Sequence, residues 1–214
     1  MKLKHCMKIL FLLLCASLFL STNGFALPMA TDTITVYSGD NRPDWFAGGE
    51  FKLVDGDDEY ISFCVEMNEH ISLGSKYTVD SVADYADSGT DYLDDPTKWL
   101  VNEYFNFNGE LQSLLKDESF SLEDLDVAVQ LAIWLLEDEI TSTQNSLANE
   151  IIGLATMYGA NYSYDNVKVI NIVDANGHAQ SQVVAAPVPE PATLLLLGTG
   201  LIGIAGASRK KFLR

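Results

Sequence analysis

Two side chains in this sequence could form a bond with each other, a cysteine at position 64 and a glutamine at position 130. Cys64 is the single cysteine between the two apolar ends of the chain, so it has no disulfide partner there. Gln130 lies within VAVQLAIWLL (127–136), where nine of ten residues are apolar, and a helix this apolar is largely buried. Attack of the Cys64 thiolate on the Gln130 side-chain carbonyl, with loss of ammonia, would join them in an internal thioester, which is an activated acyl group.

A purely structural interpretation of the same residues is also open. A free cysteine often serves as a small buried hydrophobic residue, and Cys64 fits that description. A buried primary amide that lacks a partner costs about 1–3 kcal/mol, so Gln130 would otherwise hydrogen-bond to a backbone carbonyl. Trp134 is expected in the core under either interpretation.

The first half of the segment between the apolar ends has the pattern of β-structure. Short β-branched and aromatic runs are separated by Gly, Asp and Asn, which predicts antiparallel strands at 33–37, 50–54, 60–66 and 77–82. In the third run, the alternation places Phe63 on one face of the strand and Cys64 on the other.

The second half predicts helices and then a hairpin. Pro96 can begin one helix, and Ser121 followed by acidic residues is typical of a helix N-cap. Helices are expected from Pro96, over 110–115, from Ser121 to about Asp138, and over 145–158; strands at 166–173 and 178–185 flank an Asn176-Gly177 turn. Short N-terminal strands, central helices and a C-terminal hairpin indicate an α+β fold.

The segment 27–187 is strongly acidic and long enough for one domain. It keeps 29 of the 30 acidic residues but only six of the 13 basic ones, a formal charge of −23. A nucleic-acid partner is therefore excluded, because the segment has no basic surface to contact phosphates. The acidic runs 55–59 and 91–95 could hold Ca²⁺ but do not match an EF-hand spacing, and solvated loops are the preferred interpretation. No cofactor is expected.

The N-terminus has the layout of a signal peptide. Three lysines precede an apolar run of about a dozen residues, which is short for a membrane-spanning helix. Gly24 and Ala26 occupy the small-residue positions before a cut, so we expect residues 1–26 to be removed after export through the Sec translocon.

The C-terminal segment 188–214 combines a short motif, an apolar run and a basic tail. The motif is Val188, Pro189, Glu190 and Pro191; the basic cluster is Arg209, Lys210, Lys211 and Arg214. The uncharged run 192–208 is about 25 Å long as a helix, which predicts a transmembrane helix with a cytoplasmic basic tail. This segment resembles the PEP-CTERM sorting signal of Gram-negative bacteria, which implies recognition by an exosortase in the inner membrane.

The central segment resembles a second known family over residues 33–160. Residues 63–66 (FCVE) and 129–134 (VQLAIW) look like the paired signatures of bacterial surface thioester domains, with Val129 where Thr is usual. The resemblance implies that Cys64 and Gln130 form the thioester. The residues it assigns to packing and shielding around that bond are Phe63, Ala132, Ile133 and Trp134.

Other chemistries have less support in the sequence. Cys64, Glu66, Glu69 and His70 are close together but do not share one strand face, so we expect no metal site. A Cys64 pair with His70 or His178 lacks any protease signature, and no phosphate loop, serine elbow or zinc-protease motif is present. We therefore expect no catalytic residues and no enzyme with turnover.

These patterns predict an exported protein that is anchored in the inner membrane by one C-terminal helix and reaches the surface or matrix after processing. The thioester would make covalent adhesive or cross-linking bonds to amine-bearing surface proteins or extracellular polysaccharide. The alternative is a non-covalent structural or binding protein of the envelope, exopolysaccharide or biofilm matrix. A binding module stabilised by Ca²⁺ is a further form of this alternative.

Overall fold

The computed structural model describes residues 27–86, 91–105, 110–116, 119–160 and 165–186, which belong to one compact unit. The expected signal peptide (1–26) and sorting segment (188–214), including the proposed transmembrane helix 192–208, lie outside these residues. Among the helices that are described, none is both long and apolar enough to cross a membrane.

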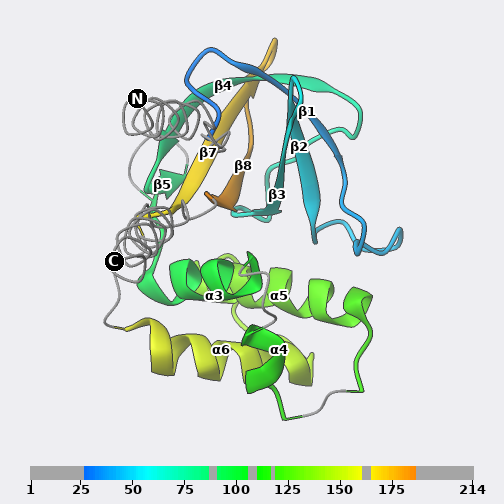
Figure 1. Cartoon of the computed structure of the whole chain (residues 1–214), viewed down its shortest axis with the longest axis vertical. Helices are drawn as coiled ribbons and strands as arrows, with labels where there is room; N and C mark the ends of the chain where they lie inside the picture. Colours follow the sequence, from blue (N-terminus) through cyan, green and yellow to red (C-terminus); the bar gives the residue numbers. More distant parts are fainter. Residues whose placement is uncertain (1–26, 87–90, 106–109, 117–118, 161–164, 187–214) are drawn as a thin grey trace, which may run out of the picture. The chain divides into compact units, whose positions relative to one another are not determined.

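Six antiparallel strands form a closed barrel in the order β1-β2-β3-β8-β7-β4 (Figure 1). They are β1 (Thr33–Ser38), β2 (Phe51–Asp55), β3 (Asp58–Cys64), β4 (Lys76–Ala83), β7 (Val167–Asp174) and β8 (Gly177–Ala185). Alternation fills the interior: in β1, Ile34 and Val36 are buried while Thr33 and Tyr37 are exposed. Closure leaves the barrel without a free edge to pair with another chain.

The predicted α+β class is confirmed, but the position of the hairpin could not be foreseen. β8 pairs with β3, and β7 pairs with β4, so the C-terminal hairpin inserts between N-terminal strands and closes the barrel. Asp174 pairs with Gly177, so the connecting residues are 175–176, one position before the predicted Asn176-Gly177 turn. The short pair β5 (Tyr85–Ala86) and β6 (Asp91–Tyr92) was not predicted.

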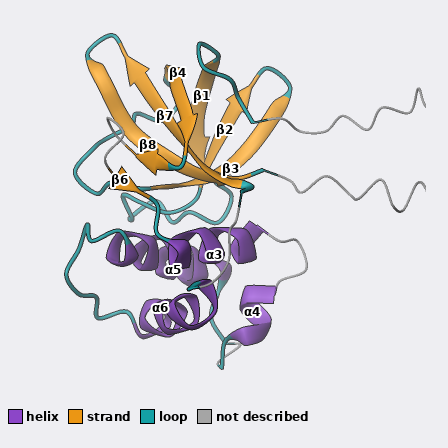
Figure 2. Cartoon of the chain, turned by 90° about the vertical axis from the view of Figure 1, so that its left-hand side faces the viewer, coloured by secondary structure: helices purple, strands orange, loops and turns teal. Residues whose placement is uncertain are grey.

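The four helices in the described part of the chain cover one end of the barrel (Figure 2). They are α3 (Asp95–Phe105), α4 (Glu110–Leu114), α5 (Leu122–Leu136) and α6 (Ser146–Gly159). The inner layer is α3, which contacts β7 and β8, together with α5, which contacts β3; α6 packs against both from outside. The helices between β4 and β7 therefore form a lid on the barrel end where β3 finishes.

The limits of α5 follow from local chemistry. The Ser121 hydroxyl accepts a hydrogen bond from the Asp124 N–H, and the Asp124 carboxylate accepts one from the Ser121 N–H, which completes the predicted cap. The helix ends at Leu136, two residues before the predicted end, because Asp138 adopts a positive φ of 59°.

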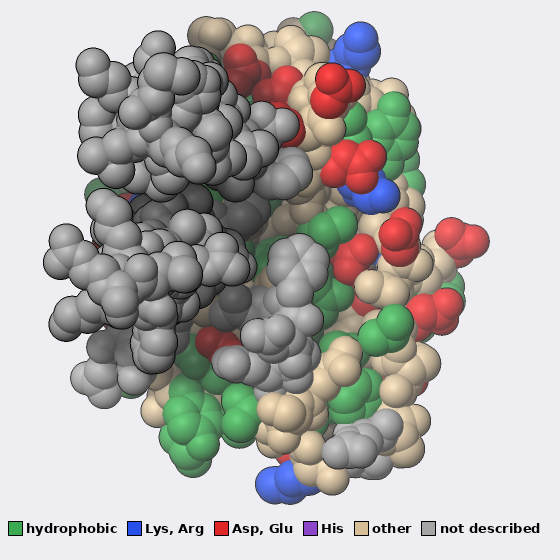
Figure 3. Space-filling view, in the orientation of Figure 1, with side chains coloured by type: hydrophobic (Ala, Val, Ile, Leu, Met, Phe, Trp, Pro, Cys, Tyr) green, Lys and Arg blue, Asp and Glu red, His purple; other side chains and the backbone are tan. Residues whose placement is uncertain are grey.

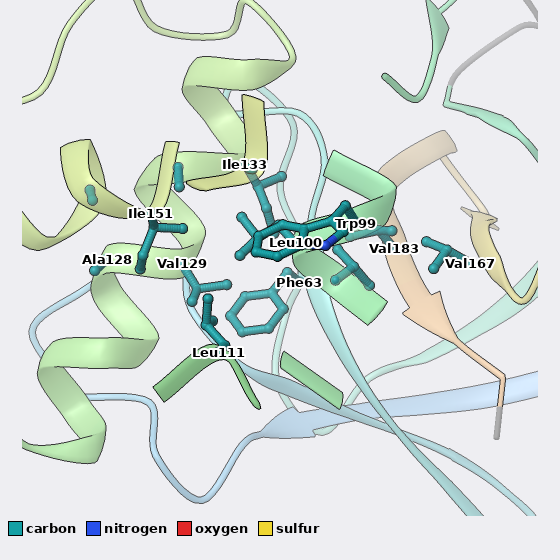
Figure 4. Close-up of a cluster of buried hydrophobic side chains, with 14 of the residues drawn as sticks. Phe63, Trp99, Leu100, Leu111, Ala128, Val129, Ile133, Ile151, Val167 and Val183 are labelled. Carbon is teal, nitrogen blue, oxygen red and sulfur yellow. The ribbon is translucent and has the colours of Figure 1, made fainter. Parts of the chain in front are cut away.

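The end of β3 separates two hydrophobic cores. Phe63 packs with Trp99, Leu100 and Ile133 in the core between the helices and the barrel (Figure 4). Cys64 belongs to the core inside the barrel, as the alternation predicted. We call these the helical core and the barrel core. The last residues of β3 are thus buried on both faces of the strand.

Ile151 of α6 tests the packing of the helical layer. Its side chain is fully buried in the helical core, whereas Ile152 is only partly buried. We expect Ile151→Ala to lower the free energy of unfolding by about 2–5 kcal/mol and Ile152→Ala by clearly less, measured by urea denaturation. Equal losses would contradict the orientation of α6.

Candidate functional site

The structure places Cys64 and Gln130, the two residues of the predicted bond, next to each other. Cys64 is the last residue of β3 and pairs with Gln182 of β8, while Gln130 lies in the middle of α5. The Gln130 Nε2 donates to the Cys64 carbonyl at 2.8 Å, and the Cys64 N–H donates to the Gln130 Oε1 at 3.0 Å. Both residues are fully buried, so the helix side chain is fixed on the end of the strand.

A second backbone N–H also points at the Gln130 carbonyl. The Gly49 N–H donates to Gln130 Oε1 at 3.2 Å, so this oxygen lies between the N–H groups of Gly49 and Cys64. Two converging backbone donors on one carbonyl oxygen are the arrangement that stabilises the negative charge of a tetrahedral acyl intermediate. The site can therefore stabilise charge on this oxygen if a nucleophile attacks the Gln130 side-chain carbon.

The Cys64 thiol faces two further glutamines that sequence reasoning missed. Its Sγ donates to the Gln180 Oε1 at 2.8 Å, and the Gln182 Nε2 donates to Sγ at 3.8 Å. Burial raises the pKa of the thiol far above its usual range, so it is protonated at neutral pH. The alternation of the two glutamines in HAQSQ was visible in the sequence, but their pairing opposite Cys64 depends on barrel closure.

The β1–β2 loop (residues 39–50) lies directly over Gln130. A Cβ at Gly48 would come within 2.7 Å of both the Gln130 Cγ and the Trp134 ring, so the bare backbone packs on them. The Arg42 guanidinium holds the loop from within, since Nε donates to the Gly48 carbonyl at 2.8 Å and Nη2 to the Phe46 carbonyl at 2.6 Å. This loop was not predicted as part of the site, although Gly48-Gly49 before a strand indicates close backbone approach.

Two buried carboxyl groups border the same loop. Asp126 Oδ1 accepts from the Glu50 N–H at 2.7 Å, and burial raises the pKa of Asp126 to about 7. The Glu50 carboxylate accepts from the Asp40 N–H, the Asn41 amide and the Tyr104 hydroxyl. Neither acid was singled out from the sequence. Asp126 precedes Gln130 by four residues, so helical spacing could have placed them on one face.

The other predicted site residues divide between the two cores. Trp134 lies in the barrel core against Phe46, with ring centroids 5.9 Å apart, and so covers Gln130 together with Gly48. Phe63, Ala132 and Ile133 lie in the helical core, on the far side of β3 and α5. Only Trp134 of these four is placed by the structure at the loop that covers the pair.

In the part of the chain that the structure describes, the acidic residues next to Cys64 do not form a metal-binding site. Glu66 is turned toward β8, where Oε2 accepts from the Ser181 N–H at 3.0 Å, and burial raises the pKa of Glu66 to about 7. No group of three His, Cys, Asp or Glu side chains among the described residues is arranged to hold a metal ion.

Gly48 provides a test of the loop contact. Because a Cβ at Gly48 would overlap Gln130 and Trp134, we expect Gly48→Ala to lower the free energy of unfolding by about 1–3 kcal/mol. The control is Gly153→Ala, at an exposed position of α6 where a Cβ meets nothing within 4 Å. There the higher helix propensity of alanine should stabilise the fold by up to about 1 kcal/mol. Urea denaturation of both variants is the measurement, and an unchanged stability of Gly48→Ala would contradict the close contact.

The raised pKa values predict how stability depends on pH. Asp126, Glu66 and Glu137, a buried residue directly after α5, each have a folded-state pKa of about 7, above the value in an unfolded chain. The folded domain then holds more protons than the unfolded chain between about pH 4 and 7, so stability falls as pH rises through this window. We expect a lower urea midpoint at pH 8 than at pH 5, with a smaller difference in Glu137→Gln. A higher midpoint at pH 8 would contradict these pKa shifts.

Comparison with known proteins agrees with the two resemblances. The PEP-CTERM protein-sorting motif matches residues 187–210, which implies export, exosortase processing and a membrane-anchored C-terminal tail before processing. No curated protein matches the sequence.

The solved structures that match this chain include the following two. The N-terminal thioester domain of a surface protein from Clostridium perfringens is 12% identical, with a TM-score of 0.50 over 72% of this chain and 98% of that one. The N-terminal domain of the Streptococcus pyogenes pilus tip adhesin Cpa is 14% identical, with a TM-score of 0.46 over 76% of this chain and 97% of that one. The chain thus combines a C-terminal PEP-CTERM sorting motif with a domain whose fold is similar to that of a bacterial thioester domain.

Proposed function

We propose that this chain is an exosortase-processed surface or matrix protein that attaches covalently to amines through a Cys64–Gln130 thioester. The observation that carries the proposal is the Gln130 side chain held on Cys64, with its carbonyl oxygen between the N–H groups of Cys64 and Gly49. The similarity in fold to a thioester domain supports it.

The proposed formation of the bond would use this arrangement. The Cys64 Sγ attacks the Gln130 side-chain carbon, and negative charge on the oxygen is stabilised by the two backbone N–H groups. The C–N bond then breaks, and the amide nitrogen leaves as ammonia with the proton that the thiol gives up. The ammonia must leave the buried site, because ammonia that stayed there would attack the thioester and restore the Gln130 amide.

The surroundings would keep the bond from water until a nucleophile enters. Both partners are fully buried, and the β1–β2 loop with Trp134 covers Gln130. A target amine then attacks the acyl carbon, an amide joins Gln130 to the target, and Cys64 leaves as a thiol. The thioester is consumed, so the protein acts once and does not turn over.

The charge of the domain favours cationic targets. Acidic side chains are spread over the visible described face and basic ones are few (Figure 3). Long-range attraction would raise the encounter rate with lysine-rich proteins or amine-bearing polymers, and salt would weaken it. Lysine amines are thus the favoured target class.

A non-covalent role is the second candidate, and one observation favours it. The Gln130 amide and the Cys64 thiol both have hydrogen-bond partners as they stand, so neither needs the bond to be satisfied. In that case the pair would serve only to fix α5 on β3, and the domain would bind its matrix partners through its surface.

Methylamine trapping separates the two functions. We expect the purified protein to take up one methylamine, in place of ammonia, on Gln130, with a free Cys64 thiol released at the same time. Trypsin places Cys64 in peptide 53–76, Gln130 in 117–168, and both Gln180 and Gln182 in 169–209, so mass spectrometry of the digest locates the label.

Three variants complete this experiment. Cys64→Ala and Gln130→Ala should abolish labelling, while Gln144→Ala, an exposed residue in the same tryptic peptide as Gln130, should leave it unchanged. Absence of label in the wild-type protein would remove the covalent function and leave the non-covalent one. A label in peptide 169–209 would show that a β8 glutamine, not Gln130, is the acyl donor.

A further inference from the structure

One face of α5 carries an unusual set of buried groups. Asp126, Gln130 and Trp134 are spaced by four residues, so they follow one another along the same face of the helix. Within the described structure, Asp126 Oδ2 and Trp134 Nε1 are buried and have no hydrogen-bond partner. An unused acceptor and an unused donor therefore stand on either side of Gln130. Unpaired buried polar atoms are costly, so their presence next to a reactive pair points to a role in its chemistry.

Asp126 contacts the loop residues next to the two N–H groups that bind the Gln130 carbonyl oxygen. The Asp126 side chain is fully buried, and its Oδ1 accepts a hydrogen bond from the Glu50 N–H. Oδ2 lies against the Cα of Gly49, because a Cβ at that position would overlap it. Gly49 is the residue whose N–H holds Gln130 Oε1. The free oxygen of Asp126 is thus adjacent to the segment that would stabilise the acyl intermediate.

The reaction needs a proton acceptor at this place. When an amine attacks a thioester, the nitrogen must lose a proton, and sulfur must leave as a thiol because burial strongly disfavours the Cys64 thiolate. The charged and titratable groups that act on Asp126 are Glu50, which opposes its ionisation, and Arg42, which favours it. Tyr104 and Cys64 also lie within its electrostatic reach, and both are held protonated.

We propose that Asp126 accepts the proton of the amine that opens the Cys64–Gln130 thioester, a role that rests on the proposed function. The amine nitrogen attacks the Gln130 acyl carbon and gives one proton to Asp126 Oδ2. The C–S bond breaks, and Asp126 returns that proton to Sγ. The products are an amide and a thiol, and the carboxylate is restored, so protons and charge balance.

The rate of methylamine uptake as a function of pH tests this proposal. Methylamine, like a lysine amine, is mostly protonated below pH 9, so its reactive form rises tenfold per pH unit. If the Asp126 carboxylate is also required, the logarithm of the rate should rise with a slope of about 2 below pH 7 and about 1 above it. A single slope of about 1 from pH 5.5 to 8.5 in the wild-type protein would overturn the proposal.

Asp126→Asn distinguishes proton transfer from positioning. Asparagine keeps an oxygen that can accept from the Glu50 N–H, so a purely positioning residue would leave the rate near that of wild type and overturn the proposal. We expect a rate roughly 100-fold lower at pH 8 and a single slope of about 1. Glu123→Gln, an exposed carboxyl in the first turn of α5, is the matched control and should behave as wild type.

Glu66 is the competing buried carboxyl beside Cys64. The change in slope should persist in Glu66→Gln, and its loss there would assign the proton acceptor to Glu66 and overturn the role of Asp126. If Asp126→Asn is isolated without the thioester, the wild-type and Glu66→Gln profiles still decide the question. Failure of the proposed function would look different, because the wild-type protein would then take up no methylamine at any pH.

Discussion

The reciprocal hydrogen bonds between the Gln130 side chain and the Cys64 backbone are the constraint on which the arrangement of this domain depends. A carboxamide without access to water must find both a donor and an acceptor, and a strand end provides both at one residue. This requirement fixes the rotation of α5 about its axis. Once Gln130 faces the strand, Trp134 must face the barrel core, and Ala132 and Ile133 must face the helical core.

The same constraint explains why β3 is buried on both faces where it ends. Its Phe63 side chain packs edge-on against Tyr104 of α3, 4.9 Å between ring centroids, while Cys64 turns toward β8 inside the barrel. A strand in this position can carry a reactive side chain without exposing it, because the helices cover one face and the barrel encloses the other. The β1–β2 loop completes the cover, and its Gly48 and Gly49 let the backbone come close enough to reach Gln130.

Local patterns predicted most elements of the fold, since capping residues, glycine turns and alternating strands act over a few residues. Ser121, with its acidic N3 residue, and the alternation of Phe63 with Cys64 are examples. The pairing of β8 with β3 could not be predicted in this way, because it depends on closure between strands that are more than 100 residues apart in sequence. Gln180 and Gln182 were missed for this reason. Asp126 was missed for a different one: an acid in the first turns of a helix is usually exposed, and only the loop above it makes it buried.

The position of Cys64 and Gln130 in the sequence also has a mechanical consequence. The two residues are 66 positions apart, and a bond between them would close the intervening chain, with β4 and α3, into a covalent ring. While the bond is intact, the chain inside that ring, roughly 220 Å long when fully extended, could not be pulled out by its ends. A target would be joined to the chain at Gln130, so a pull between the target and an anchored C-terminus would pass through the residues after Gln130. The segment between Cys64 and Gln130, with the strands it contributes to the barrel, would then carry none of the load.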